Sequence, residues 1–390
     1  MLKDLSFSAV VAGFIAVLVG FTSSVAIVFQ AAQALGATPA EISSWMWALG
    51  MGTGLTSIGL SLWYRQPVFI AWSTPGAALL ATTHGVSLPV ATGAFIVSGV
   101  LITLAGAFGL FERLMDRVPV AIAAALLAGV LTRFGLDAAL AAHADPLLVG
   151  VMAMVFVLGR RLWPRFAVPG VLVAGICLAA ARGGISLANV QWGWARPVFV
   201  MPEFSVAAAV GLGLPMFIVT MASQNLPGVA AQRAAGVTAP VSPVIATTGI
   251  ATLLLAPFGS FGLNLAAITA AICMGPEAHP DMRRRYIAPV SAGVFYVLIG
   301  LGGGAVVGLM AAFPHALVVG VAGLALLGTI AGALSSALAV EKHRDAAALT
   351  FLVALSGVTL GGIGAPFWAV VAGGVALGVQ HFRSAAPPAR

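Results

Sequence analysis

Long apolar runs, separated by short polar or Gly/Pro-rich turns, fill almost the whole chain. Fourteen such runs can be distinguished, and each is close to the roughly 20 residues that a helix needs to cross a bilayer. Residues 183–203 form the one long connection between them. The pattern predicts an all-α membrane protein with spans at 6–35, 41–63, 67–84, 88–111, 119–142, 146–163, 167–182, 204–226, 240–257, 258–275, 286–312, 315–338, 346–362 and 365–382.

Composition excludes most other classes of protein. The chain is 61% hydrophobic and only 7% charged, whereas a soluble domain carries about a quarter charged residues. Soluble enzymes, disordered scaffolds and nucleic-acid binders are therefore excluded. No P-loop, zinc-type His/Glu spacing or G-x-S-x-G elbow is present, so we expect no enzyme activity, catalytic residue, metal or cofactor. The two cysteines, Cys177 and Cys273, lie in apolar runs and predict no disulfide.

The positive charges separate between alternate loops. Fifteen of the 18 Lys and Arg residues fall on one side of the predicted spans, and only Arg133, Arg182 and Arg196 fall on the other. Because cytoplasmic loops carry the excess of positive charge, this distribution places both termini in the cytoplasm.

A short repeat relates the two halves. Residues 31–39 (AAQALGATP) resemble residues 230–240 (AAQRAAGVTAP) at an offset of 199. The first copy ends span 1 and the second ends span 8, so equivalent positions are seven spans apart. Since seven is odd, the second half must be inverted relative to the first, and inverted repeats hold their substrate near the bilayer midplane.

Span 3 is poorly suited to a continuous helix. Residues 66–72 are rich in β-branched and aromatic side chains, and Ser73-Thr74-Pro75 then opens an Ala/Leu-rich run that ends near His84. A hydroxyl residue before proline is typical of a helix start. The pattern predicts an extended strand followed by a half-helix.

Span 10 shows a similar change. Residues 257–264 are Gly-rich, whereas residues 265–272 favour a helix, with Asn264 as the expected N-cap. Both half-helices would then start near the membrane centre, where their free amides and partial positive charge suit an anion. The alternative interpretation is that both spans are helices kinked by Gly and Pro that only pack.

Three stretches resemble the bacterial benzoate membrane transport proteins, the BenE family: residues 19–24 (VGFTSS), 221–228 (MASQNLPG) and 264–272 (NLAAITAAI). The resemblance covers nearly the whole chain, and the SQNLPG motif is its most specific part. It implies import of benzoate with protons across the bacterial inner membrane, by the seven-plus-seven inverted fold of uracil permeases and sulfate-permease-type anion transporters. It also implies core-domain halves at 1–116 and 204–312 and gate-domain halves at 117–203 and 313–390.

One departure from the nucleobase carriers favours an organic anion. Spans 8 and 10 of those relatives typically carry carboxylates that bind a neutral base, whereas this chain has Ser223-Gln224-Asn225 and Leu263-Asn264 at the matching places. A carboxylate would repel an anionic substrate, but neutral donors would not. An inorganic-anion or nucleobase carrier of the same fold, or a passive anion channel, remains the alternative. The expected partners are an aromatic carboxylate, protons and lipid, and related folds often form homodimers.

The candidate substrate-binding residues lie in spans 1, 3, 8 and 10. For each hydroxyl a simpler role, capping or bonding within its own helix, stays open, and for each aromatic ring so does packing. Arg133 and Asp137 lie four residues apart in span 5 and form either a structural ion pair or part of a gate or proton path. The substrate-binding candidates are Thr22, Ser23, Ser24, Trp72, Ser73, Thr74, Ser223, Gln224, Asn225, Phe261, Asn264 and Leu265.

Overall fold

A computed structural model describes residues 4–111, 120–185, 193–266, 269–275, 278–358, 360 and 365–384. The first half of the chain contains α1 (Phe7–Ala34), α2 (Pro39–Tyr64), β1 (Ile70–Trp72), α3 (Thr74–Ala81), α4 (Leu88–Ala107), α6 (Val120–Ala144), α7 (Pro146–Leu162) and α8 (Ala167–Ala181). The second half contains α9 (Val206–Ala208), α10 (Leu214–Thr220), α11 (Leu226–Ala234), α12 (Val241–Leu255), β2 (Leu263–Leu265), α13 (Ala270–Met274), α14 (Ile287–Leu301), α15 (Gly303–Ala312), α16 (His315–Leu338), α17 (Arg344–Ser356) and α18 (Ala365–Ser384). Two π-helical turns, Ala209–Gly213 and Met221–Asn225, join α9, α10 and α11.

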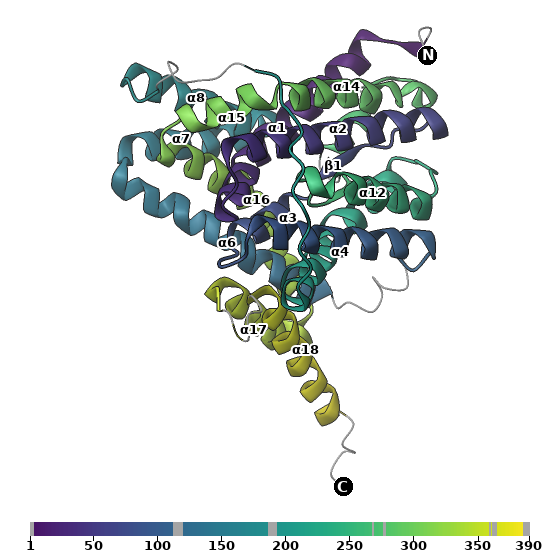
Figure 1. Ribbon diagram of the computed structural model, residues 1–390, viewed down its shortest axis with the longest axis vertical. Coiled ribbons are helices and arrows are strands. Elements are labelled where there is room, and N and C mark those ends of the chain that lie inside the picture. Colours follow the sequence, from purple (N-terminus) through teal and green to yellow (C-terminus); the bar gives the residue numbers. More distant parts are fainter. Residues whose placement is uncertain are drawn as a thin grey trace.

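Helices α14, α2, α12 and α4 pack side by side in one layer (Figure 1). Glycines let the backbones of α2 and α14 touch: a Cβ added to Gly50 would lie 2.6 Å from Gly300 Cα, and one added to Gly54 would lie 2.6 Å from the Gly293 carbonyl oxygen. Such small-residue contacts are typical of helix pairs in membranes. This layer, with α1 packed on α14, holds the two short strands.

A second group of helices packs around α6 and α16. Helix α17 packs on α6 and α18, and α7 packs on α8. The two central helices also meet through a glycine, because a Cβ added to Gly323 of α16 would lie 2.5 Å from the Phe134 carbonyl oxygen of α6. Helix α1 contacts both α14 and α16, so it lies between the layer and this second group.

The predicted strand and half-helix in span 3 are both present. Strand β1 pairs antiparallel with β2, with Ile70 opposite Leu265 and Trp72 opposite Leu263. Two serines of α2 fasten the chain here: Ser57 Oγ accepts from the Ile70 amide (3.0 Å), and Ser61 Oγ donates to the Val68 carbonyl (2.7 Å). We call residues 66–81 the first crossover segment and residues 257–274 the second.

The prediction for span 10 is wrong in its boundary. Residues 265–272 were expected to be helical from an Asn264 cap, but Asn264 and Leu265 lie in β2, and α13 begins only at Ala270. The reason is the pairing with β1, which keeps Leu263–Leu265 extended despite the helical preference of the residues that follow. Residues 267 and 268 of the expected helix lie outside the described residues.

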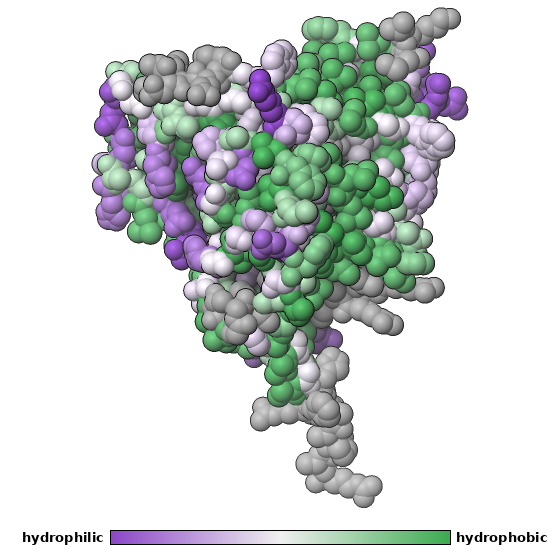
Figure 2. Space-filling model, in the orientation of Figure 1, coloured by the Kyte–Doolittle hydropathy of each residue, from purple (hydrophilic) through white to green (hydrophobic). Residues whose placement is uncertain are grey.

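Several helices are suited to a bilayer. Within the described residues, six helices are long and apolar enough to cross one, and a seventh span results if α14 and α15, bent by 68° at Gly302, are taken together. In Figure 2 apolar surface covers much of the right half of the view, over α14, α2, α12 and α4, and hydrophilic residues gather mainly on the left, with a few near the centre and at the right edge. The chain is therefore a multi-pass, mostly helical protein, and the count of fourteen crossings stays a prediction.

Candidate functional site

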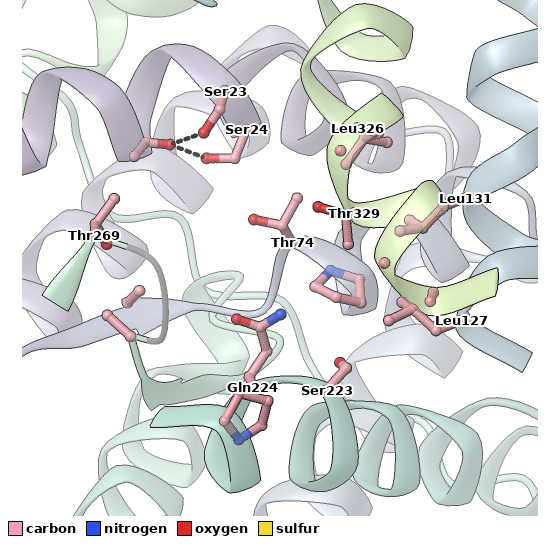
Figure 3. Close-up of a pocket in the computed structure, with 18 of the residues that line it drawn as sticks. Ser23, Ser24, Thr74, Leu127, Leu131, Ser223, Gln224, Thr269, Leu326 and Thr329 are labelled. Carbon is pink, nitrogen blue, oxygen red and sulfur yellow. Dashed lines mark hydrogen bonds between the residues drawn. The ribbon is translucent and has the colours of Figure 1, made fainter. Parts of the chain in front are cut away.

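A cavity of about 930 Å³ lies between the two groups of helices (Figure 3). Helix α1, the two crossover segments, the second π turn and α14 form one side of it, and α6, α7, α8 and α16 form the other. A ligand the size of a benzene ring with one polar group fits such a volume. Six of the predicted site residues line this cavity: Ser23, Ser24, Trp72, Thr74, Ser223 and Gln224.

The start of α3 faces the cavity through Thr74. Ser73 is the N-cap: its buried Oγ accepts from the Gly76 amide (3.1 Å) and is 2.8 Å from Thr220 Oγ1. Pro75 has no N–H, and the Gly76 amide is already used. Among the described hydrogen bonds none uses the Thr74 amide or hydroxyl, so Thr74 can offer both to an anion at this helix start.

Asn264 lies behind the cavity and holds the two crossover segments together. It is fully buried and does not line the cavity. With its amide oriented to satisfy both neighbours, Nδ2 donates to the Leu265 carbonyl (2.9 Å), and Oδ1 accepts from the Ser73 amide (2.9 Å), which it shares with the Gly262 carbonyl (2.9 Å). Asn264 therefore contacts the cap residue of α3, in the other half of the chain, instead of capping α13.

The neighbours Gln224 and Asn225 have different surroundings. Asn225 is fully buried, and its Oδ1 accepts from the Leu265 amide (2.9 Å), so it fixes β2. Gln224 lines the cavity, and among the described hydrogen bonds it has no partner. Figure 3 shows its amide extending into the same space as the Thr74 side chain. Ser223 also lines the cavity, but its hydroxyl donates to the Val219 carbonyl (2.5 Å).

The hydroxyls of α1 are bound within their own helix. Ser23 and Ser24 line the cavity, and both donate to the Gly20 carbonyl (3.0 and 2.7 Å; dashed in Figure 3). Ser24 Oγ also accepts from Trp72 Nε1 (3.0 Å). Thr22 donates to the Leu18 carbonyl (2.7 Å) and lies outside this cavity. In these rotamers Ser23 and Ser24 present acceptor lone pairs to the cavity, so neither is a ready donor to an anion.

Of the two aromatic candidates, one lines the cavity and the other is packed in the protein interior. Trp72 lines the cavity and packs edge-on against Tyr296, with ring centroids 5.3 Å apart. Phe261 is fully buried against Trp45 and Phe95 and does not line the cavity. Leu265, in β2, is likewise buried outside it.

Tyr296 of α14 is a cavity residue that the sequence analysis missed. Its side chain is almost fully buried, and Gly20 leaves room for the phenol, since a Cβ there would lie 3.0 Å from Oη. Its hydroxyl has no partner among the described hydrogen bonds. Only three tyrosines occur in the chain, so a phenol within an apolar span was a usable signal. Thr269 and Thr329 also line the cavity and were missed.

The opposite side of the cavity is mostly apolar. Leu127 and Leu131 of α6 and Leu326 of α16 face it (Figure 3). We call these three residues the apolar wall, and Thr74, Gln224 and Tyr296 the polar wall. Among the described residues that line the cavity, the charged side chain is that of Arg160 of α7. The site therefore combines neutral donors, an apolar surface and one cation, which suits an anion that carries a hydrophobic group.

Arg133 and Asp137 lie away from this cavity. They form an ion pair along α6 (Nε to Oδ1, 3.5 Å) with side chains that are 58% and 44% exposed. The exposure of both side chains favours a structural ion pair at the protein surface, and a role in gating or proton passage stays a prediction.

Comparison with known proteins decides the family. A family model described as benzoate membrane transport protein, BenE, matches residues 3–379. The chain belongs to the BenE family. Members of this family are membrane transporters and not enzymes, in agreement with the sequence analysis.

Two curated relatives match this BenE-family chain over nearly its whole length. The inner membrane protein YdcO of Escherichia coli is 50% identical over 365 residues, which cover 93% of both chains. The benzoate membrane transport protein of Acinetobacter baylyi is 39% identical over 372 residues, or 95% of this chain and 94% of the relative. Both matches span both halves of the chain.

A solved structure supports the fold. The transmembrane domain of a cyanobacterial bicarbonate transporter, BicA, superposes with a TM-score of 0.56 and covers 97% of each chain at 13% identity. At this identity the likeness concerns the architecture alone.

Proposed function

We propose that this chain imports benzoate, or a closely related aromatic carboxylate, together with protons across the bacterial inner membrane. The observation that carries the proposal is the cavity with a polar wall on one side and an apolar wall on the other. The family and the 39% identical benzoate transport protein support the substrate class.

The polar wall suits the carboxylate group. Thr74 offers an amide and a hydroxyl, Gln224 an amide, and Tyr296 a phenol, and these groups have no protein partner among the described hydrogen bonds. Hydrogen bonds to an ionised acceptor are worth about 1.5–3 kcal/mol each. Since no Asp or Glu is found among the described residues of the lining, no carboxylate there would repel the substrate.

The apolar wall suits the ring. Burying apolar surface contributes about 25 cal/mol per Å², so contact with Leu127, Leu131 and Leu326 favours a benzoate over a small inorganic anion. Trp72 adds an aromatic surface beside Tyr296 of the polar wall. An inorganic anion would gain nothing from these side chains.

The inverted repeat is supported by helix contacts that recur between equivalent spans, which are seven positions apart in the chain. In the seven-plus-seven numbering, α2–α14 joins spans 2 and 11, and α12–α4 joins spans 9 and 4. Within the halves, α1–α3 (spans 1 and 3) corresponds to α11–α13 (spans 8 and 10). Between the halves, α17–α6 (spans 13 and 5) corresponds to α7–α16 (spans 6 and 12). We propose that the layer around α2 and α14 is the core domain and the group around α6 and α16 the gate domain, and that they move relative to each other.

The cavity extends toward the predicted cytoplasmic side. Val120, Arg160, Pro164 and Ser336 line it and lie at the helix ends that the charge distribution places in the cytoplasm. On the other side α1, α8, α15 and α16 leave a gap of only about 10 Å³, lined by apolar residues and Thr22. These features favour an inward-facing conformation with the outer side closed.

Counterflow in proteoliposomes tests the proposal. Vesicles loaded with unlabelled benzoate should take up external labelled benzoate transiently above its equilibrium level, because a carrier exchanges substrate, whereas a channel or bare lipid only equilibrates it. An imposed pH gradient, acidic outside, should then drive saturable accumulation beyond that of protein-free vesicles, which admit neutral benzoic acid. Absence of counterflow would contradict the carrier, absence of saturable pH-driven uptake would contradict proton coupling, and stronger competition by bicarbonate or uracil than by benzoate would contradict the substrate.

A further inference from the structure

Arg160 brings a positive charge into the cavity from the gate side. It lies in the last turn of α7, and its side chain lines the cavity beside Pro164 and Val168. The guanidinium carbon lies 5.9 Å from the ring centroid of Phe156, one turn earlier in the same helix. This cation–π contact orients the guanidinium.

Gly328 of α16 leaves the space that the guanidinium occupies. A Cβ added at Gly328 would lie 3.2 Å from Arg160 Nη1, tighter than nine in ten real Cβ contacts, so the guanidinium would have to shift by a few tenths of an ångström. The guanidinium thus lies against two elements of the gate domain, the Phe156 ring of α7 and Gly328 of α16.

Arg160 has no anionic partner among the residues that the structure describes. The described ion pairs involve Arg133, Arg182, Arg284 and Arg344, and no described carboxylate lies within 4.0 Å of the Arg160 guanidinium. A guanidinium offers five donors in a planar fork that matches a carboxylate. At the mouth of a cavity, such a cation attracts anions and its effect is screened by salt.

The adjacent Arg161 provides a comparison within the same turn. Both arginines are exposed, both follow the positive-charge pattern, and both can interact with the carboxyl end of α7. Successive residues point about 100° apart around a helix, and Arg161 does not line the cavity. A role in topology or helix stability would apply to both residues, whereas a role in the cavity applies only to Arg160.

We propose that Arg160 forms a second anion position, at the cytoplasmic end of the cavity, which binds the carboxylate of the substrate after it leaves the polar wall. The inference rests on the proposed function. It assigns to the gate domain a binding residue that acts on release to, and capture from, the cytoplasm. The polar wall of the core domain acts at the midplane.

The test compares KM for benzoate from each face of the membrane, in inside-out and right-side-out vesicles that contain Arg160→Ala, Arg160→Lys, Arg161→Ala or the unaltered protein. Arg160→Ala should raise KM at the cytoplasmic face about fivefold, as expected for loss of a partly exposed ion pair, and leave KM at the other face unchanged. Arg160→Lys should retain part of the effect, and Arg161→Ala should behave like the unaltered protein. Raising the salt concentration should raise the cytoplasmic KM of the unaltered protein and not that of Arg160→Ala.

Two results would overturn the inference: equal behaviour of Arg160→Ala and Arg161→Ala, or an equal change at both faces. If Arg160→Ala does not insert, Arg160→Gln decides, because it removes the charge but keeps a long polar side chain, and it should also raise only the cytoplasmic KM. Failure of the unaltered protein to transport benzoate would refute the proposed function itself. Normal transport with no effect of Arg160 would refute this inference alone.

Discussion

The first crossover segment ends in an eight-residue helix that its own Ser73 caps, whereas the second ends in a five-residue helix whose cap position, Thr269, makes no side-chain cap hydrogen bond. The two strands pair with each other, and the first continues through Ser73 into a helix start at the cavity, while the second segment also reaches the cavity, through Thr269. The second instead contributes Asn264, which contacts Ser73 from behind. The equivalent segments thus differ: the first presents a capped helix start to the cavity, whereas the second reaches the cavity without a side-chain cap and supports Ser73 through Asn264.

The largest expected effect comes from removing the residue that joins the two segments. Asn264→Ala leaves the Leu265 carbonyl without its donor in a fully buried place, which costs about 1–3 kcal/mol. We expect counterflow activity to fall at least about tenfold, together with a lower unfolding temperature in detergent. Normal insertion, checked by the amount of protein in the membrane, is the control, and full activity would contradict the bracing role.

Gln224→Ala should have the next largest effect. Gln224 belongs to neither crossover segment and makes no described hydrogen bond in the protein, so its loss should leave the fold intact. Loss of a hydrogen bond to a carboxylate costs about 1.5 kcal/mol at the low end, which corresponds to about a tenfold rise in KM. An unchanged KM would show that the polar wall does not include this amide. Asn225→Ala is the contrast, since it should destabilise β2 and lower the unfolding temperature.

Two threonines, one at the start of α3 and one beside α13, allow a matched comparison of the two crossover segments. Thr74→Val removes a hydroxyl from the start of α3 but keeps the shape and the amide, and should raise KM about fivefold, less than the loss of Gln224 because the Thr74 amide can still bind the carboxylate. Thr269→Val is the equivalent change beside α13 and should alter KM less than about twofold. A larger effect for Thr269 would reverse the proposed difference between the segments. Both values come from the same uptake assay.

The smallest effect is expected away from both segments. Asp137→Asn breaks an ion pair whose side chains are about half exposed, and such pairs contribute about 0–1 kcal/mol. Uptake and pH dependence should therefore remain unchanged. A shifted pH profile would instead restore Asp137 as part of a proton path.

The sequence is sufficient to predict local strands and helix starts, but not the distant residues with which they pair. The β-branched and aromatic residues of 66–72 and the Ser73-Thr74-Pro75 signal predict the strand and helix start of the first crossover segment, because both depend on neighbours in the chain. The prediction that Asn264 caps a helix is wrong because the conformation of this residue depends on pairing with Ala71, almost two hundred residues earlier. Gln224 and Asn225 are adjacent polar residues in one span, and only packing shows which is bound to β2.

A count of charges in each loop likewise does not predict the direction in which a side chain points. Arg160 and Arg161 contribute equally to the predicted orientation, yet only Arg160 lines the cavity. Tyr296 lies in an apolar run in which a phenol and a packing ring look alike, and its role depends on the space left by Gly20. Family resemblance supplied the proposed substrate, and the structure was needed to distinguish the groups that face the cavity from those that support them.

The glycine contacts between α2 and α14 have a mechanical consequence. Their backbones touch at Gly50 and Gly54, and the first crossover segment is tied to α2 by Ser57 and Ser61. Helices this close cannot slide past each other without separating, so the donors cannot change sides of the membrane independently of the layer that carries them. If transport moves that layer, its lipid-facing surface moves with it, and because mismatch between protein and bilayer thickness carries an energetic cost, the thickness of the surrounding bilayer becomes one of the determinants of the transport rate.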